Sequence, residues 1–288
     1  MNVQPLRGIE GLRRSKRVRK GMFVLPSLFT AGNIAAGYFA ISQTMQGIAG
    51  DFVHFDYAAI AIGFAVLFDG LDGRIARMTQ TTSEFGKQLD SLADVITFGV
   101  APALLAYMWG SKFVAAPFDN ADLQNKLIKL GAVVTFLFLT AGASRLARFN
   151  IQSNPQPSNP GRPGRKYFVG MPIPAAAGVI AAVVHLSRGV PIATWWLSFI
   201  WSLLVFSVGY LMVCTWRFYS FKDIDLRKQH PFTNFILIAG LVLAIWMFSR
   251  PVLFFIAMTY MLSGVLARLS YVLRKSPQSV PETPANAD

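Results

Sequence analysis

The chain has 288 residues, of which 53% are hydrophobic and only 14% are charged, and its mean hydropathy is +0.45. This composition argues against an ordinary water-soluble domain and is typical of a membrane protein with several spans. The formal net charge is +13 at pH 7, but the basic residues gather at the ends of apolar runs without a nucleic-acid-binding motif, so we expect no nucleic-acid partner.

Apolar runs of roughly 20 residues, the length that an α-helix needs to cross a bilayer, recur along the chain. Two of the charge-free runs extend from Gly21 to Gly50 and from Gly189 to Trp216. The sequence therefore predicts an all-α integral membrane protein, a polytopic helical bundle of about eight transmembrane helices. The predicted spans cover residues 23–46, 53–80, 84–109, 126–150, 170–187, 192–215, 232–249 and 251–272.

These spans predict three parts of the chain. Residues 1–22 form a basic cytoplasmic or interfacial segment, residues 23–273 form the transmembrane domain, and residues 274–288 form a polar tail that we expect to be disordered. Between the fourth and fifth spans, residues 152–166 contain four prolines and two glycines, which predicts an irregular loop.

Basic residues are distributed unequally between the two sides of the predicted bundle. An even number of spans puts both termini on one side, and the loops on that side carry all but five of the 27 lysines and arginines. By the positive-inside rule this side is cytoplasmic, so we expect both termini and the active site to face the cytoplasm. The five exceptions are Lys112, Lys126, Lys129, Arg188 and Arg250.

Four aspartates at the ends of the second and third spans form the most informative pattern. Asp69 and Asp72 are three residues apart and Asp90 and Asp94 are four apart, so each pair shares one helix face. If residues 79–83 turn the chain, the two helices become antiparallel neighbours and the four carboxylates converge. Such a cluster near a membrane needs a cation, and all-oxygen ligands favour Mg²⁺, Mn²⁺ or Ca²⁺ over zinc.

Small residues and an arginine accompany these carboxylates. Gly73, Ala76 and Gly86 leave space beside the helices for a nucleotide base or sugar, and Arg77 could pair with a phosphate or a carboxylate. Mg²⁺ and Mn²⁺ often combine carboxylates with substrate phosphates, which predicts a phosphate-bearing substrate. The alternative is a structural polar seam, in which aspartates cap helix ends and small residues allow close helix packing.

Together these residues match the pattern D-x₂-D-G-x₂-A-R-x₈-G-x₃-D-x₃-D, which resembles the signature of the CDP-alcohol phosphatidyltransferases, a family of helical membrane enzymes. The resemblance implies that Asp69, Asp72 and Asp90 bind divalent metal, Mg²⁺ or Mn²⁺, that holds the diphosphate of a CDP-lipid. It also implies that Asp94 is the general base that takes a proton from the acceptor alcohol.

The same resemblance implies roles for the small residues and for the whole assembly. Gly73, Ala76 and Gly86 would contact the cytidine, and Arg77 would support the diphosphate or the acidic cluster. The implied state is a homodimer in a lipid bilayer, and the implied location is a bacterial inner membrane.

Beyond the motif, three segments resemble the branch of the family that uses L-serine as the acceptor. They are Val95–Ala103, Ser144–Asn150 and Phe168–Ala177. The first span is similar as well, except that Ser27 stands where that branch usually has Asn. The resemblance implies CDP-diacylglycerol and L-serine as substrates, with phosphatidyl transfer to the serine hydroxyl and release of CMP.

Serine carries a carboxylate, and its selection requires a cation. Arg145 and Arg148 lie one turn apart at the end of the fourth span, where one could bind serine and the other a lipid phosphate; ordinary positive-inside anchors are the alternative. Asn33 could hydrogen-bond the substrate or pack between helices. The histidines, among them His185, lie near predicted span ends, and we interpret them as interface residues.

Two other functions remain open from the sequence. The first is the same reaction with choline or another alcohol as acceptor. The second is a transporter or ion pathway whose intramembrane aspartates carry ions, although the sequence shows no internal repeat of the kind that many transporters have.

Overall fold

The computed structural model describes residues 7–79, 84–151, 157–158, 167–220 and 231–274, with side chains described for 28–70, 85–151, 157–158, 167–220 and 236–273. Almost all of these residues are helical. The helices are α1 (Arg7–Ile48), α2 (Val53–Thr79), α3 (Glu84–Asp94), α4 (Ala101–Gly110), α5 (Ala121–Ile151), α6 (Ile173–Leu186), α7 (Trp195–Val213) and α8 (Pro231–Arg274).

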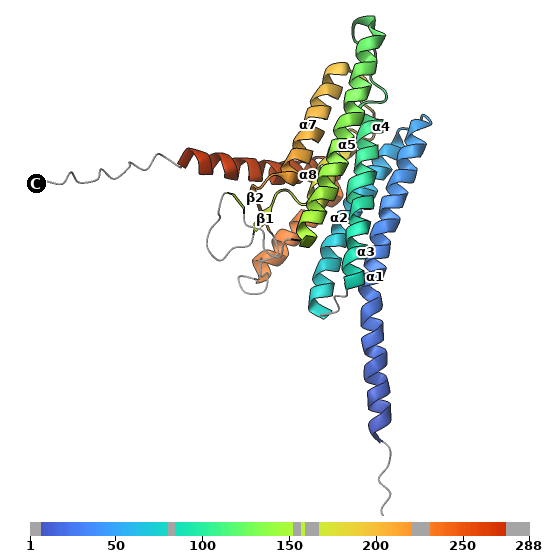
Figure 1. Cartoon of the computed structure of the whole chain (residues 1–288), viewed down its shortest axis with the longest axis vertical. Coiled ribbons are helices and arrows are strands. Elements are labelled where there is room, and N and C mark those ends of the chain that lie inside the picture. The colour runs from blue at the N-terminus through green and yellow to red at the C-terminus, as the bar shows by residue number, and fades with distance from the viewer. Residues whose placement is uncertain (1–6, 80–83, 152–156, 159–166, 221–230, 275–288) are drawn as a thin grey trace, which may run out of the picture.

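Helices α3 and α4 belong to one rod, because the π-helix Val95–Val100 joins them without a break. Figure 1 shows α1, α2, this rod and α5 running side by side as an elongated bundle. Helix α1 packs along α2, α5 packs along α7, and α6 packs against both α2 and α8. Buried Phe55, Ile62, Phe98, Phe138 and Ile180 form part of the core between these helices.

The helical membrane class predicted from the sequence is confirmed. Five segments in the described part of the chain are long and apolar enough to cross a membrane: Val53–Gly70, Phe85–Gly110, Ala121–Ile151, Trp195–Val213 and Ile236–Leu273. The predicted number of eight separate spans is not confirmed, since the described residues form seven helical rods.

Helix α6 is shorter than the span predicted at 170–187. Gly170 has φ +72°, and Pro172 has an extended backbone, so the helix begins only at Ile173. Its 14 residues extend about 21 Å at 1.5 Å per residue, less than the roughly 30 Å of a bilayer core. Most of its residues are buried, which gives α6 the character of an internal core helix.

The last two predicted spans form one element, α8. Its helix is broken at Phe248, where φ is −134° and ψ is 50°, three residues before Pro251. Proline at this position cannot donate its backbone nitrogen to the preceding turn and disfavours helical geometry before it. The two arms of α8 run in different directions from this break (Figure 1).

Two features at the chain's other boundaries were not predicted. Helix α1 runs from Arg7 through the predicted boundary at residue 22 without a break and extends well beyond the bundle (Figure 1). In addition, β1 (Tyr167–Val169) and β2 (Arg217–Tyr219) pair as a two-stranded antiparallel ribbon. Residues 152–156 and 159–166 of the predicted loop, and the predicted tail after 274, lie outside the described residues.

Candidate active site

Three of the four motif aspartates converge, as the sequence predicted. Asp69 comes from α2, and Asp90 and Asp94 come from successive turns of α3. Each offers one carboxylate oxygen, and these three oxygens lie within 4.8 Å of one another. Asp69 and Asp90 are half-buried, and Asp94 is 9% exposed. This all-oxygen donor set fits a hard divalent cation such as Mg²⁺ or Mn²⁺.

The remaining motif residues can be placed less completely. Asp72, Gly73, Ala76 and Arg77 lie on the last turns of α2, but their side chains are outside the described part of the structure. Gly86 lies in the first turn of α3, on the same element as Asp90 and Asp94. The sequence-predicted cytidine and diphosphate contacts of these residues are therefore still predictions.

Helix α1 contributes a buried amide to the carboxylate cluster. Asn33 is 2% exposed, and its Nδ2 donates a hydrogen bond of 3.5 Å to Oδ1 of Asp94. The backbone carbonyl of Asn33 in turn accepts a hydrogen bond of 2.9 Å from the Thr97 hydroxyl. One turn further along α1, a Cβ on Gly37 would lie 2.6 Å from Thr97 Oγ1, so glycine permits this close approach. Helix α1 is thus fixed tightly against the segment that carries Asp94.

The π-helix begins directly after Asp94. Within it Thr97, Phe98 and Gly99 are buried, and the rod continues into α4 without a change of chain direction. A π-helix holds more residues per turn than an α-helix, and such insertions occur frequently at functional sites. Here the insertion sets the rotation of Asp90 and Asp94 relative to α4, and it brings Thr97 to the Asn33 carbonyl.

Arg145 and Arg148 contact backbone carbonyls near the cytoplasmic end predicted for α5. Buried Arg145 donates from Nε to Met171 O at 2.5 Å and from Nη2 to Gly170 O at 3.2 Å. Arg148 donates to the carbonyls of Val213 and Val169 at 3.1 and 3.4 Å. Arg145 therefore holds the turn between β1 and α6, and Arg148 joins the end of β1 to the end of α7, roles that the sequence did not indicate.

The same end of α5 contacts the aspartate helix. Asn150 Nδ2 donates a hydrogen bond of 3.0 Å to the hydroxyl of Ser91, the residue after Asp90. This contact places the final turns of α5, including Arg148, at the level of the carboxylate cluster. Further along the rod, α5 packs against the π-helix and α4.

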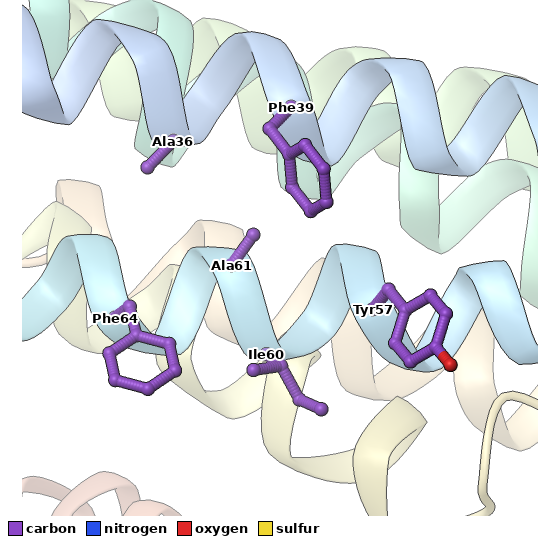
Figure 2. Close-up of a pocket in the computed structure, with 6 residues that line it drawn as sticks. All are labelled: Ala36, Phe39, Tyr57, Ile60, Ala61 and Phe64. Carbon is purple, nitrogen blue, oxygen red and sulfur yellow. The ribbon is translucent and has the colours of Figure 1, made fainter.

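An apolar groove lies between α1 and α2, away from the carboxylates. Figure 2 shows its lining side chains on the two facing helices: Ala36, Phe39, Tyr57, Ile60, Ala61 and Phe64. Nothing in this lining is ionisable at neutral pH, so the groove suits hydrocarbon and not a diphosphate. The chemistry therefore belongs to the carboxylate cluster and not to this groove.

A second polar cluster joins α2, α6 and α8. His185 Nδ1 and Asp56 Oδ1 are 2.6 Å apart, His185 Nε2 and the Ser249 hydroxyl are 3.0 Å apart, and Arg250 Nη2 is 4.0 Å from Asp56 Oδ2. His185, which we predicted near a span end, is only 7% exposed and joins three helices in the protein interior. Its hydrogen-bond partners lie 129 and 64 residues away in the sequence, which is why the sequence pattern did not reveal them.

Known proteins are similar to this chain over most of the helical region. A model of the CDP-alcohol phosphatidyltransferase family matches residues 23–205. The CDP-diacylglycerol–serine O-phosphatidyltransferase of Helicobacter pylori is 35% identical, over 80% of this chain and 84% of the relative. That of Mycobacterium leprae is 34% identical, over 75% of this chain and 62% of the relative. Archaetidylserine synthase of Methanothermobacter thermautotrophicus is 36% identical, over 55% and 56% of the two chains.

The apolar helices and the converging carboxylates define an integral membrane protein with an acidic site suited to a divalent cation. With the matches above, the particular class follows: the chain belongs to the CDP-alcohol phosphatidyltransferase family. It is a membrane-embedded transferase of phospholipid synthesis.

Proposed function

We propose that this enzyme transfers the phosphatidyl group of CDP-diacylglycerol to L-serine, giving phosphatidylserine and CMP. The observation that carries the proposal is the convergence of Asp69, Asp90 and Asp94 within 4.8 Å, in a chain that is 35% identical to a serine O-phosphatidyltransferase. The other motif residues support the transfer from a CDP-lipid, and the three segments similar to the serine-using branch support serine as the acceptor.

Asp69, Asp72 and Asp90 would hold the metal ion, with Mg²⁺ or Mn²⁺ as the candidates. When bound, the metal would supply positive charge to the diphosphate and to the leaving phosphate of CMP. Asp94 accepts the proton of the acceptor hydroxyl while that oxygen forms a bond to the β-phosphorus and the bond from this phosphorus to the CMP oxygen breaks. The 9% exposure of Asp94 keeps bulk water away from this base.

Gly73, Ala76 and Gly86 would line the cytidine side of the site, where the lack of large side chains lets the nucleotide approach the helix backbone. Arg77 would bind the diphosphate or a motif carboxylate. Their position supports this assignment, since all four lie on the turns of α2 and α3 that flank the carboxylates.

We assign the acceptor side to Arg145, Arg148 and Asn33. Arg145 uses Nε and Nη2 to hold Met171 and Gly170, which leaves Nη1 as the group for the serine carboxylate or a lipid phosphate. Asn33 approaches from the opposite helix, α1, through its contact with Asp94. Selection of serine over choline would then depend on charged and polar groups on both sides of the base.

The arrangement in the membrane follows from the charge distribution. We propose that residues 23–273 form the catalytic membrane domain and that the carboxylates and both termini face the cytoplasm of a bacterial inner membrane. The bend at Phe248 supports two crossings by α8, since its 44 residues would extend about 66 Å as a straight helix, twice a bilayer core. The family resemblance further suggests a homodimer.

Purified enzyme in lipid nanodiscs tests the reaction directly. With CDP-diacylglycerol and Mg²⁺ or Mn²⁺, we expect radiolabelled serine to enter the lipid fraction in a 1:1 ratio with released CMP, and chelation by EDTA to stop both. CMP release with choline but not with serine would show that choline, and not serine, is the acceptor. Absence of CMP release with serine, choline, glycerol phosphate and inositol would refute the enzyme function and favour an ion pathway.

A further inference from the structure

Asn33 has one half of its side-chain amide occupied, and the other half has no partner among the described side chains. Its Nδ2 donates to Asp94 Oδ1 at 3.5 Å, while its buried Oδ1 accepts no hydrogen bond from the part of the chain that the structure describes. A buried carbonyl oxygen without a donor is destabilising by about 1–3 kcal/mol, so native proteins usually satisfy such groups. Asn33 is 2% exposed, which makes bulk water a poor source of that donor.

The orientation of this amide follows from the neighbouring charge. If the amide were turned by 180°, its oxygen would face the carboxylate of Asp94, and two acceptors would repel each other. The donor half must therefore face Asp94, and Oδ1 is the atom left available. The position of Asn33 is also fixed, because Thr97 holds its backbone carbonyl and Gly37 lets α1 lie close to Thr97.

Oδ1 belongs to the same amide whose Nδ2 contacts Asp94, so a ligand that reaches Asp94 would meet two acceptors, Asp94 and Asn33 Oδ1. A single hydroxyl can donate only one proton, and in the proposed reaction that proton goes to Asp94. An amino alcohol carries a second donor group, an ammonium with N–H protons, on the carbon next to the one that bears the hydroxyl. A quaternary ammonium such as that of choline has no N–H and would leave Oδ1 unsatisfied.

We infer that Asn33 is a positioning residue for Asp94 and that its Oδ1 binds the ammonium group of an amino-alcohol acceptor. This inference rests on the proposed function and adds the chemical basis of acceptor selection. Asn33 binds the ammonium group, while the carboxylate of serine is bound by another residue. The amide thereby links recognition of the acceptor to the orientation of the base.

Acceptor analogues separate this role from a purely structural one. Asn33→Leu has a side chain of similar size without hydrogen-bonding atoms. We expect it to raise the KM for serine and the inhibition constant of ethanolamine by about 10- to 100-fold, as expected for a lost hydrogen bond to a charged group. The inhibition constant of 3-hydroxypropanoate, which lacks the ammonium, should be unchanged, as should the KM for CDP-diacylglycerol and the midpoint of the Mn²⁺ titration.

Gln43→Leu provides the matched control. Gln43 is a buried amide on the same helix, and its Oε1 bonds to His54, away from the carboxylates. This variant should leave all five constants unchanged. If Asn33→Leu does not fold, Asn33→Ser, which keeps a short polar group, is measured in the same way and should lie between the wild type and full loss.

Three outcomes would overturn the inference. Equal weakening of 3-hydroxypropanoate and ethanolamine would mean that Asn33 acts only through Asp94. A shifted Mn²⁺ midpoint would make Oδ1 a metal ligand, and an unchanged serine KM would remove Asn33 from the subsite. Wild-type enzyme that releases no CMP with serine would instead refute the proposed function itself, so the two failures are distinguishable.

Discussion

Helix α2 carries two acidic sites with opposite surroundings. Asp56, near its beginning, is 6% exposed and lies against His185 and Arg250, so the protein itself supplies the groups that stabilise the carboxylate. Asp69, 13 residues and about 20 Å further along the helix, lies against Asp90 and Asp94 instead. A carboxylate that lies beside an arginine and a histidine of its own chain is suited to hold helices together, whereas three carboxylates that converge are suited to bind a metal ion.

Among the tests of this contrast, the largest effect on activity is expected at Asp94, the proposed general base. Asp94→Asn keeps the size of the side chain but cannot accept the acceptor's proton, so turnover should fall by about 10²- to 10⁴-fold. Binding of the CDP-lipid, measured by isothermal titration with CDP-diacylglycerol in nanodiscs, should remain detectable. Loss of binding together with turnover would contradict the division of roles between Asp94 and the metal ligands.

A smaller effect, with a different signature, is expected at Asp69. Asp69→Asn removes one charge from the metal-binding group, so the Mn²⁺ concentration for half-maximal activity should rise by at least roughly tenfold, the range typical of weakened metal sites. Nucleotide affinity should weaken in parallel. The measurement is a Mn²⁺ titration of CMP release at two CDP-diacylglycerol concentrations, and a titration identical to that of the wild type would refute the assignment.

The contrasting prediction concerns the cluster around Asp56. His185→Leu leaves the buried carboxylate of Asp56 and the Ser249 hydroxyl without their shared partner, which should destabilise the fold by about 1–3 kcal/mol. We expect a lower midpoint of thermal unfolding in detergent, while kcat per folded enzyme is unchanged. A loss of kcat with an unchanged unfolding midpoint would mean that the cluster around Asp56 also takes part in catalysis. The contrast between a structural and a catalytic acidic site would then be wrong.

Among the variants that affect the site, the smallest loss of activity is expected where α1 contacts the rod. In Gly37→Ala the new Cβ would meet Thr97 Oγ1 at 2.6 Å and Thr97 Cα at 2.9 Å, so α1 must shift, at a cost of about 1–3 kcal/mol. Activity should fall severalfold as Asn33 moves from Asp94. Gly32→Ala on the same helix, with nothing within 4 Å, is the control and should leave unfolding midpoint and activity unchanged or slightly raised.

The convergence of the aspartates was predictable because it depends on local geometry. Residues at i and i+4 share a helix face, and a short connection makes neighbouring helices antiparallel, so Asp69, Asp90 and Asp94 could be brought together from spacing alone. The helical membrane class was predictable for a similar reason, since long apolar runs without charge have few other solutions.

Contacts between distant segments were not predictable from the sequence. The carbonyls that Arg145 binds are exposed by a turn that needs a positive φ at Gly170, and the adjoining ribbon pairs strands 50 residues apart. In the sequence, Arg145 and Arg148 are two positive charges at a helix end, which equally suit lipid phosphates. Pro251 similarly indicated a boundary between two spans. It did not indicate that the helix continues after a bend at Phe248, so that both spans belong to one element, α8.

The π-helix after Asp94 accommodates one residue more than a regular α-helix of the same rotation, because its hydrogen bonds join residues i and i+5. Deleting one residue between Val95 and Val100 would let the rod return to α-helix with the aspartates and the buried Trp109 end still in phase. Adding one residue there would instead turn the two ends by about 100° relative to each other, so that either the aspartates leave α2 or Trp109 leaves its core contacts. A gene for this protein can therefore lose one of those six codons in frame more easily than it can gain one.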